Sequence, residues 1–269
     1  MVQICSITTE VVVRMRNENS TFEKIKALFD NVCDVIKSYY ASYNKNGTLQ
    51  KGTIVEVVAK YSCLGCINDT LRNQTEVRNN RVDALYKECH RLAVNILVEE
   101  LYYLLNQAGY KVAISTEAEL EYGKADVLIT ITSYGLNLRG KAKELLVEVK
   151  TGNSLSLSQI FRYLLDGRSD TVIVWRIRKR QVLVFNAQTI EPLLIEFMKM
   201  ICLRANRLFS SQIPSTCLHK RYLNYEPTQE ELQKAFKEFS EALVETLPFV
   251  LQFILKELEI ILPQQSKDE

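Results

Sequence analysis

Acidic, basic and amide side chains recur at a defined spacing in the middle of this chain. Asp126 is followed by the triplet Glu148–Lys150 and then by Gln159 and Tyr163. Carboxylates bind hard divalent cations, and an amine can neutralise charge that develops on a phosphate group. The residue types and their order therefore predict a metal-dependent phosphodiesterase site.

Two short apolar runs rich in β-branched residues carry these groups. Residues 125–130 and 144–150 are each predicted to form a strand. Because side chains alternate across a strand, the two ends of the Glu148–Lys150 triplet share one face and the valines beside them fill the other. Asp126 interrupts a buried strand, where a lone carboxylate is costly unless it is paired or binds a metal. We expect neighbouring strands that bring both acids to one Mg²⁺ or Mn²⁺.

A helix is expected after the second strand, through about residue 165. Gln159 and Tyr163 are four residues apart, so they are neighbours on one face of that helix. Both would face the carboxyl end of the strand that carries Glu148. A plain alternation of Glu and Lys on a solvated strand is the alternative for the triplet taken alone, because short motifs recur by chance.

Three motifs in this order resemble those of a known superfamily. Gly123 to Asp126, Glu148 to Lys150 and Gln159 to Tyr163 are similar to the Gly-x-x-Asp, Glu-x-Lys and Gln-x-x-x-Tyr motifs of PD-(D/E)XK nucleases. Within that superfamily they resemble the RecB-like branch, which includes CRISPR-associated exonucleases. The resemblance covers about residues 81–186. It implies an α/β fold with a restriction-endonuclease-like core, in which helices flank a central mixed sheet of four to five strands.

The resemblance also implies a role for each matched residue. Asp126 and Glu148 would be metal ligands for Mg²⁺ or Mn²⁺, and the carbonyl of Val149 would add a further ligand. Lys150 would be the catalytic amine.

The helix that follows would help to position the substrate. The resemblance implies that Gln159 and Tyr163 position DNA or the metal site, and we add Arg162, between them, as a DNA-positioning residue. A basic cluster at residues 176–180 could contact phosphates without regard to sequence, as DNA-backbone contacts do. A solvated hairpin tip is the alternative for that cluster.

One more ligand is expected from the helix over about residues 82–108. RecB-like nucleases place a metal-binding His upstream, and His90 is the only upstream histidine. Archaeal Holliday-junction resolvases of the same superfamily instead supply a glutamate from this helix, and Glu100 falls within its apolar stripe. The two residues are about 15 Å apart along a helix, too far for one ion. We prefer Glu100, keep His90 as the alternative, and note Glu117 and Glu119 as acids that line the site or face solvent.

Composition indicates a globular intracellular enzyme without identifying it. The chain has 269 residues, of which 47% are hydrophobic and 25% charged. Its seven cysteines are irregularly spaced, which favours a reducing compartment, and no signal peptide is recognisable. We therefore expect a cytoplasmic protein. The apolar C-terminal helix carries charges that argue against a membrane span.

Four of the cysteines are candidates for a thiolate-bound metal site. Cys63 and Cys66 have metal-ligand spacing, and Cys202 and Cys217 follow the core. CRISPR-associated relatives with an iron–sulfur cluster place one cysteine before the core and three closely spaced ones after it, a pattern that is absent here. The sequence therefore favours a role for these cysteines as small buried side chains over a role as ligands of zinc or of an iron–sulfur cluster.

We expect an N-terminal accessory α/β region at residues 1–77, a nuclease core at 78–188 and a C-terminal helical region at 189–269. The expected function is a metal-dependent DNA nuclease. One alternative is a nuclease-fold protein that binds nucleic acid or an assembly without cleavage. A second is a Holliday-junction resolvase-like endonuclease, which depends on Glu100. The implied partners are DNA and either a second copy of the chain or a helicase, repair or defence complex, with no membrane.

Overall fold

The computed structural model describes residues 26–27, 29–30, 34, 81–132, 142–152, 155–210 and 227–260. The elements in chain order are α5 (Arg81–Gln107), β1 (Lys111–Leu120), β2 (Gly123–Thr132), β3 (Lys143–Lys150), α6 (Leu157–Asp166), β4 (Thr171–Arg176), the short 3₁₀ helix η2 (Ile177–Lys179), β5 (Gln181–Asn186), α7 (Ala187–Ser210) and α8 (Gln229–Glu257). Nearly all of the expected region 1–77 lies outside the described residues, as do the side chains of the four cysteines considered as metal ligands.

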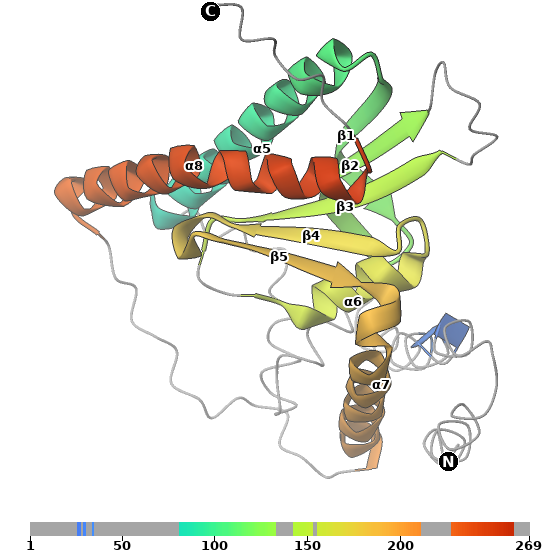
Figure 1. Cartoon of the computed structure of the whole chain (residues 1–269). Coiled ribbons are helices and arrows are strands. Elements are labelled where there is room, and N and C mark those ends of the chain that lie inside the picture. Colours follow the sequence, from blue (N-terminus) through green and yellow to red (C-terminus); the bar gives the residue numbers. More distant parts are fainter. Residues whose placement is uncertain are drawn as a thin grey trace, which may run out of the picture.

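The strands form one five-stranded sheet in the order β1-β2-β3-β4-β5 (Figure 1). The pairs β1–β2, β2–β3 and β4–β5 are antiparallel, and β3–β4 is parallel. A parallel pair needs a crossover connection, and α6 supplies it. The predicted α/β class, with a mixed sheet of four to five strands flanked by helices, is confirmed.

The main core lies between the sheet and the helices α5 and α8, which cross on the same face (Figure 1). On α5 the buried side chains recur every four residues, which is the spacing of one helical face. They are Cys89, Ala93, Leu97, Leu101 and Leu105. Every second residue of the central strands faces this layer, and α6 lies against the opposite face.

Helix α8, which lies within the C-terminal helical region expected at residues 189–269, contributes buried side chains to this core. The indole Nε1 of Trp175 on β4 donates to Thr246 Oγ1 of α8 at 2.8 Å. A capping box opens α8, with Thr228 and Glu231 each bonding the other's backbone amide. Helix α8 continues through Pro248 without ending there. Pro248 is on the exposed side, and packing of the residues around it offsets the lost backbone hydrogen bond.

The few described residues of the N-terminal region lie on the turn between β1 and β2. The ring of Phe29 packs edge-on against Tyr122, with centroids 5.0 Å apart. Tyr122 Oη donates to Asp30 Oδ1 at 2.9 Å. This turn leads directly into β2, so the N-terminal contacts support the strand that carries Asp126.

None of the helices in the described ranges is both long and apolar enough to cross a membrane. The charged positions that the sequence analysis noted near the end of α8 fit that observation.

Candidate active site

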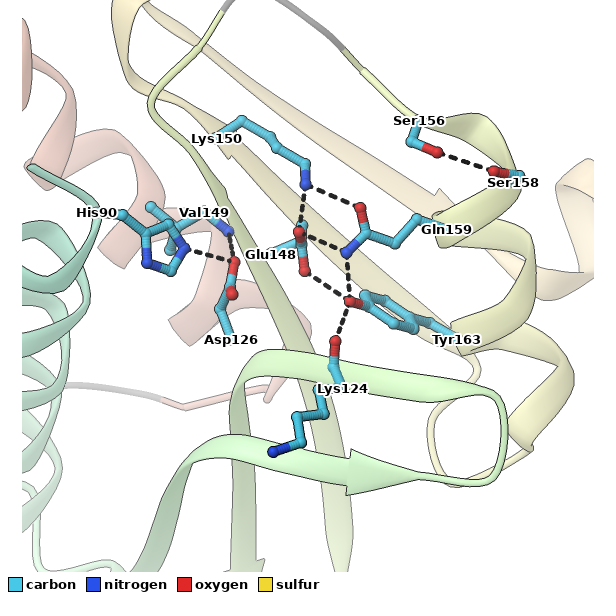
Figure 2. Close-up of polar contacts among 10 residues, drawn as sticks. All are labelled: His90, Lys124, Asp126, Glu148, Val149, Lys150, Ser156, Ser158, Gln159 and Tyr163. Atoms are coloured by element: carbon cyan, nitrogen blue, oxygen red, sulfur yellow. Dashed lines mark hydrogen bonds and ion pairs between the residues drawn. The ribbon is translucent and has the colours of Figure 1, made fainter. Parts of the chain in front are cut away.

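Asp126 lies where β2 and β3 separate. The Cα pairing between the two strands ends at Val127 and Val147, one residue after Asp126 on β2. Beyond that point, Asp126 Oδ2 accepts a hydrogen bond from the backbone N–H of Val149 at 2.7 Å (Figure 2). The carboxylate thus takes the place of a strand partner for that amide, and a buried amide requires one. The amide of Val149 makes this contact, and its carbonyl as a metal ligand stays a prediction.

Glu148 and Lys150 share one face of β3, as strand alternation predicts. Glu148 is only 2% exposed. Its Oε1 accepts from Lys150 Nζ at 2.5 Å and from Gln159 Nε2 at 2.8 Å. A carboxylate this deeply buried is held by an ammonium and an amide, which is the partnership that burial of charge requires.

The pair on α6 completes a closed network around Glu148 (Figure 2). Gln159 Oε1 accepts from Lys150 Nζ at 2.8 Å, and Gln159 Nε2 donates to Tyr163 Oη at 2.6 Å. Tyr163 Oη also lies 2.9 Å from Glu148 Oε2 and contacts the backbone carbonyl of Lys124. Tyr163 is 1% exposed, so it supports the acid and the amine and does not lie where DNA could contact it.

The electrostatics of this cluster favour a bound cation. Burial, and then the charge of Asp126, raise the pKa of Glu148 to about 7, although Lys150 and Tyr163 act in the opposite direction. A buried carboxylate whose pKa is raised by a neighbouring acid is stabilised in its charged form by a positive ion beside it. Carboxylate oxygens are the ligands that Mg²⁺ prefers. Mn²⁺ accepts carboxylate oxygens together with an imidazole, such as that of His90. The chemistry of the residues therefore fits the expected metal.

His90 of α5 is the upstream residue that reaches this site. Its Nε2 lies 3.1 Å from Asp126 Oδ2 (Figure 2). The hydrogen bond to Asp126 raises the pKa of His90, although burial lowers it. Glu100 was the preferred upstream ligand and His90 the alternative, but of the two it is His90 that contacts Asp126.

Glu100, the preferred upstream ligand, is exposed on α5. It precedes Leu101 of the buried stripe by one residue, which is a rotation of about 100° on a helix, so it misses the buried face. It is also ten residues from His90, which contacts Asp126. The junction-resolvase alternative depended on Glu100 and loses its supporting residue.

Arg162 is also placed differently from our expectation. It is 5% exposed, and its Nη1 donates to the carbonyl of Tyr122 at 2.5 Å. A Cβ at Gly123, the next residue, would lie 3.0 Å from the same Nη1, which explains the glycine. Arg162 therefore ties α6 to the turn before β2, and it does not present a cation to DNA.

The basic cluster at residues 176–180 is largely used within the fold. Arg178 Nη1 donates to Tyr86 Oη of α5 at 2.8 Å, and Arg180 Nε lies 2.5 Å from Glu245 Oε2 of α8. These contacts attach the β4–β5 hairpin to both helices. This arrangement resembles the alternative of a solvated hairpin tip more than it resembles a cluster free to bind phosphates.

A cleft of about 630 Å³ opens between α5 and the β1–β2 pair, and it reaches Asp126 and His90. Sequence reasoning missed this cleft. Its lining comprises one face of α5 and one segment of the strands: Tyr86, Lys87, His90, Arg91, Val94, Asn95, Thr116, Glu117 and Asp126. One side of the candidate site is thus accessible from solvent.

Glu117 has an unusual backbone in the wall of this cleft. Its φ is +50°, in the left-handed region that only a few per cent of non-glycine residues adopt. The flanking residues Thr116 and Ala118 pair with Val127 and Ala125, respectively. Glu117 and Asp126 are the positions between these two pairs, and they are not themselves paired in the described register.

Replacing Glu117 by glycine is expected to leave the stability unchanged or slightly raised. Glycine removes a left-handed cost of roughly 1–2 kcal/mol and adds a chain-entropy cost of roughly 0.5–1 kcal/mol. Glu117→Val should instead destabilise the fold, since a β-branched residue tolerates this conformation poorly. Urea unfolding measures both variants. Equal destabilisation by glycine and valine would contradict a left-handed backbone at this position.

The side chains of the site are not already arranged around one metal position. Among the described residues, no three His, Cys, Asp or Glu side chains already converge on one point. Glu148 is held by Lys150, Gln159 and Tyr163, and Asp126 by Val149 and His90. The two acids thus belong to adjacent polar networks that meet at the divergence of β2 and β3.

Comparison with family models, with curated proteins and with solved structures finds no match to this chain. The case for a function therefore depends on the residues of the site and on their arrangement.

Proposed function

We propose that this protein is a Mg²⁺- or Mn²⁺-dependent nuclease that hydrolyses phosphodiester bonds in DNA, built on a restriction-endonuclease-like core. The observation that carries the proposal is the environment of Glu148. This acid is buried next to Asp126 and bonded to Lys150 at the point where two strands diverge. A fold has no structural need for two acids and an amine at such a position, because buried polar networks are costly unless every member is paired.

The residues that would hold the cation are Asp126 and Glu148, with His90 from α5 and the carbonyl of Val149 as a proposed further ligand. When bound, the cation would polarise the phosphate and lower the pKa of a water molecule. Until a cation binds, His90 keeps Asp126 oriented through their 3.1 Å contact. The hydrogen bond from the Val149 amide to Asp126 Oδ2 fixes the direction of this carboxylate as well.

Lys150 is the proposed catalytic amine. Its ammonium is held 2.5 Å from Glu148 and 2.8 Å from Gln159, and its side chain is partly exposed. It can therefore reach a phosphate at the site and donate to an oxygen on which charge develops. Gln159 and Tyr163 are positioning residues that keep the ammonium and the carboxylate in place.

Substitution of Asp126 tests the proposal. Asp126→Asn keeps the size of the side chain and an oxygen for the Val149 amide, and it removes the charge. We expect the wild type to cut labelled DNA in Mn²⁺ and not in EDTA, and the variant to cut about 100-fold more slowly or less. Glu119→Gln, at an exposed acid of the neighbouring strand, is the matched control and should retain the wild-type rate.

Equal hydrolysis by the wild type and by Asp126→Asn would refute the proposal. DNA binding that persists in EDTA, without any cleavage in Mn²⁺, would instead support the alternative of a nuclease-fold protein that binds nucleic acid without cutting it.

Mn²⁺ is expected to stabilise the protein more at about pH 8 than at about pH 6, because the cation must displace a proton from Glu148 below its raised pKa. A raised pKa in the folded state also sets the sign for the metal-free protein. The stability contribution of this group is fully present below its ordinary pKa of 4.5 and is lost as the pH rises through about 7. Thermal unfolding with and without Mn²⁺ at both pH values measures the effect. A larger Mn²⁺ effect at the lower pH would contradict it.

A further inference from the structure

We propose that the cleft between α5 and the β1–β2 pair is the seat of an unpaired polynucleotide strand, adjacent to the bond that is cut. The inference rests on the proposed nuclease function and names the form of its substrate. It is carried by the size of the cleft, by the charges on its two walls and by its position beside Asp126 and His90.

The size of the cleft favours one strand over two. Its volume of about 630 Å³ lies in the range of small-molecule sites, which is about 300–1,000 Å³. Such a space holds a nucleotide or a short run of them. A duplex cannot enter it, since the major groove of B-DNA alone is about 12 Å wide.

The α5 wall carries the groups that bind a phosphodiester backbone. Its lining residues recur at i and i+4, so they form one continuous face of the helix. Lys87 and Asn95 on this face are exposed, and no hydrogen bond or ion pair joins either to another residue that the structure describes. Arg91 is exposed as well and shares its guanidinium with Glu88 at the helix surface. Lys87 and Arg91 can therefore each meet a phosphate oxygen.

The opposite wall has the opposite charge. Glu117, held in its left-handed conformation, lines the strand side of the cleft together with Asp126. A polyanion between the walls is drawn toward α5 and repelled from β1. This asymmetry turns the phosphates toward Lys87 and Arg91. Because His90 lies on the same face of α5, a strand that follows this face passes the candidate catalytic carboxylates.

Binding to short fluorescent oligonucleotides, measured by anisotropy with the full chain in EDTA, tests the seat without requiring cleavage. The probes are an unpaired DNA strand, the same sequence as RNA, and the blunt DNA duplex. The variant is Lys87→Ala with Arg91→Ala. Its matched control is Lys234→Ala with Lys237→Ala, which removes the same charge from exposed positions on α8.

We expect the wild type to bind an unpaired strand more tightly than the duplex. The α5 double variant should bind several-fold more weakly, and its slope of log Kd against log salt should fall by roughly 1.4, since each phosphate contact to a single strand contributes about 0.7. The α8 control should match the wild type. Comparison of the DNA and RNA strands identifies which polynucleotide the cleft takes.

Equal binding of the duplex, no binding of either strand, or equal losses in the two double variants would overturn the seat. These outcomes are separate from the fate of the nuclease proposal. A wild type that binds an unpaired strand through Lys87 and Arg91 and cuts nothing in Mn²⁺ would support the seat and refute the nuclease. A wild type that cuts DNA with the α5 double variant unimpaired would do the reverse.

Discussion

Lys150→Ala is expected to lower the rate of metal-dependent DNA hydrolysis about 100-fold or more, the loss typical of removing one preorganised group that stabilises developing charge. Lys150 Nζ donates to the buried Glu148 at 2.5 Å, and Gln159 holds the same ammonium from a second side at 2.8 Å. An amine held in this way needs no rearrangement when charge develops on a nearby phosphate. The measurement is the single-turnover rate on labelled DNA in Mn²⁺.

Lys143→Ala is the matched control for this experiment. Lys143 is at the other end of β3, is exposed, and pairs with Glu259 on the surface at 2.9 Å. Its loss removes the same charge from the same strand and should leave the rate unchanged. Thermal unfolding of both variants separates loss of chemistry from loss of fold. A folded Lys150→Ala protein that cuts DNA at the wild-type rate would remove Lys150 from the mechanism.

Trp175→Ala is expected to lower the free energy of unfolding by about 3–5 kcal/mol, the usual cost of deleting a fully buried aromatic side chain. Trp175 is 0% exposed and lies on β4, under α8. Its indole N–H donates to Thr246 Oγ1, so the contact joins the sheet to a helix about 70 residues later in the chain. The loss of stability is large because the alanine variant both leaves a cavity and removes this hydrogen bond between the sheet and α8.

A milder variant isolates the hydrogen bond. Thr246→Val keeps the shape of the side chain and leaves the indole N–H buried without its acceptor, which costs about 1–3 kcal/mol. Val244→Ala, at a largely exposed position on the same helix, is the control and should change stability by less than about 0.5 kcal/mol. Urea unfolding measures all three variants. If Trp175→Ala and Thr246→Val were both as mild as the control, α8 would not be packed on the sheet as described.

Local patterns were enough to predict the elements of the core. Alternation of apolar residues placed the strands that became β2 and β3, and it placed Glu148 and Lys150 on one face. Four-residue spacing placed Gln159 and Tyr163 on one face of α6. These features depend on neighbouring residues in the chain, because strand and helix periodicities repeat over two to four positions. The mixed sheet was implied by the resemblance of the motifs, and the observed strand order with a parallel β3–β4 pair agrees with it.

Contacts between distant segments were decided by the tertiary structure. The sequence could not show that His90, and not Glu100, reaches Asp126, because both lie on the same helix and its rotation is set by packing of the buried stripe. Arg162 was in the right element and turned inward, toward a carbonyl 40 residues earlier in the chain. The cleft beside Asp126 is lined by α5, β1 and β2, which only the tertiary structure brings together.

The sequence by itself determined which side chains were available for chemistry and which strand or helix face each would occupy. The tertiary structure decided which of them meet, which are buried as supports, and where solvent reaches the site. The physical reason is that periodicity fixes the direction of a side chain relative to its own element. The position of one element against another depends on packing that is summed over the whole core.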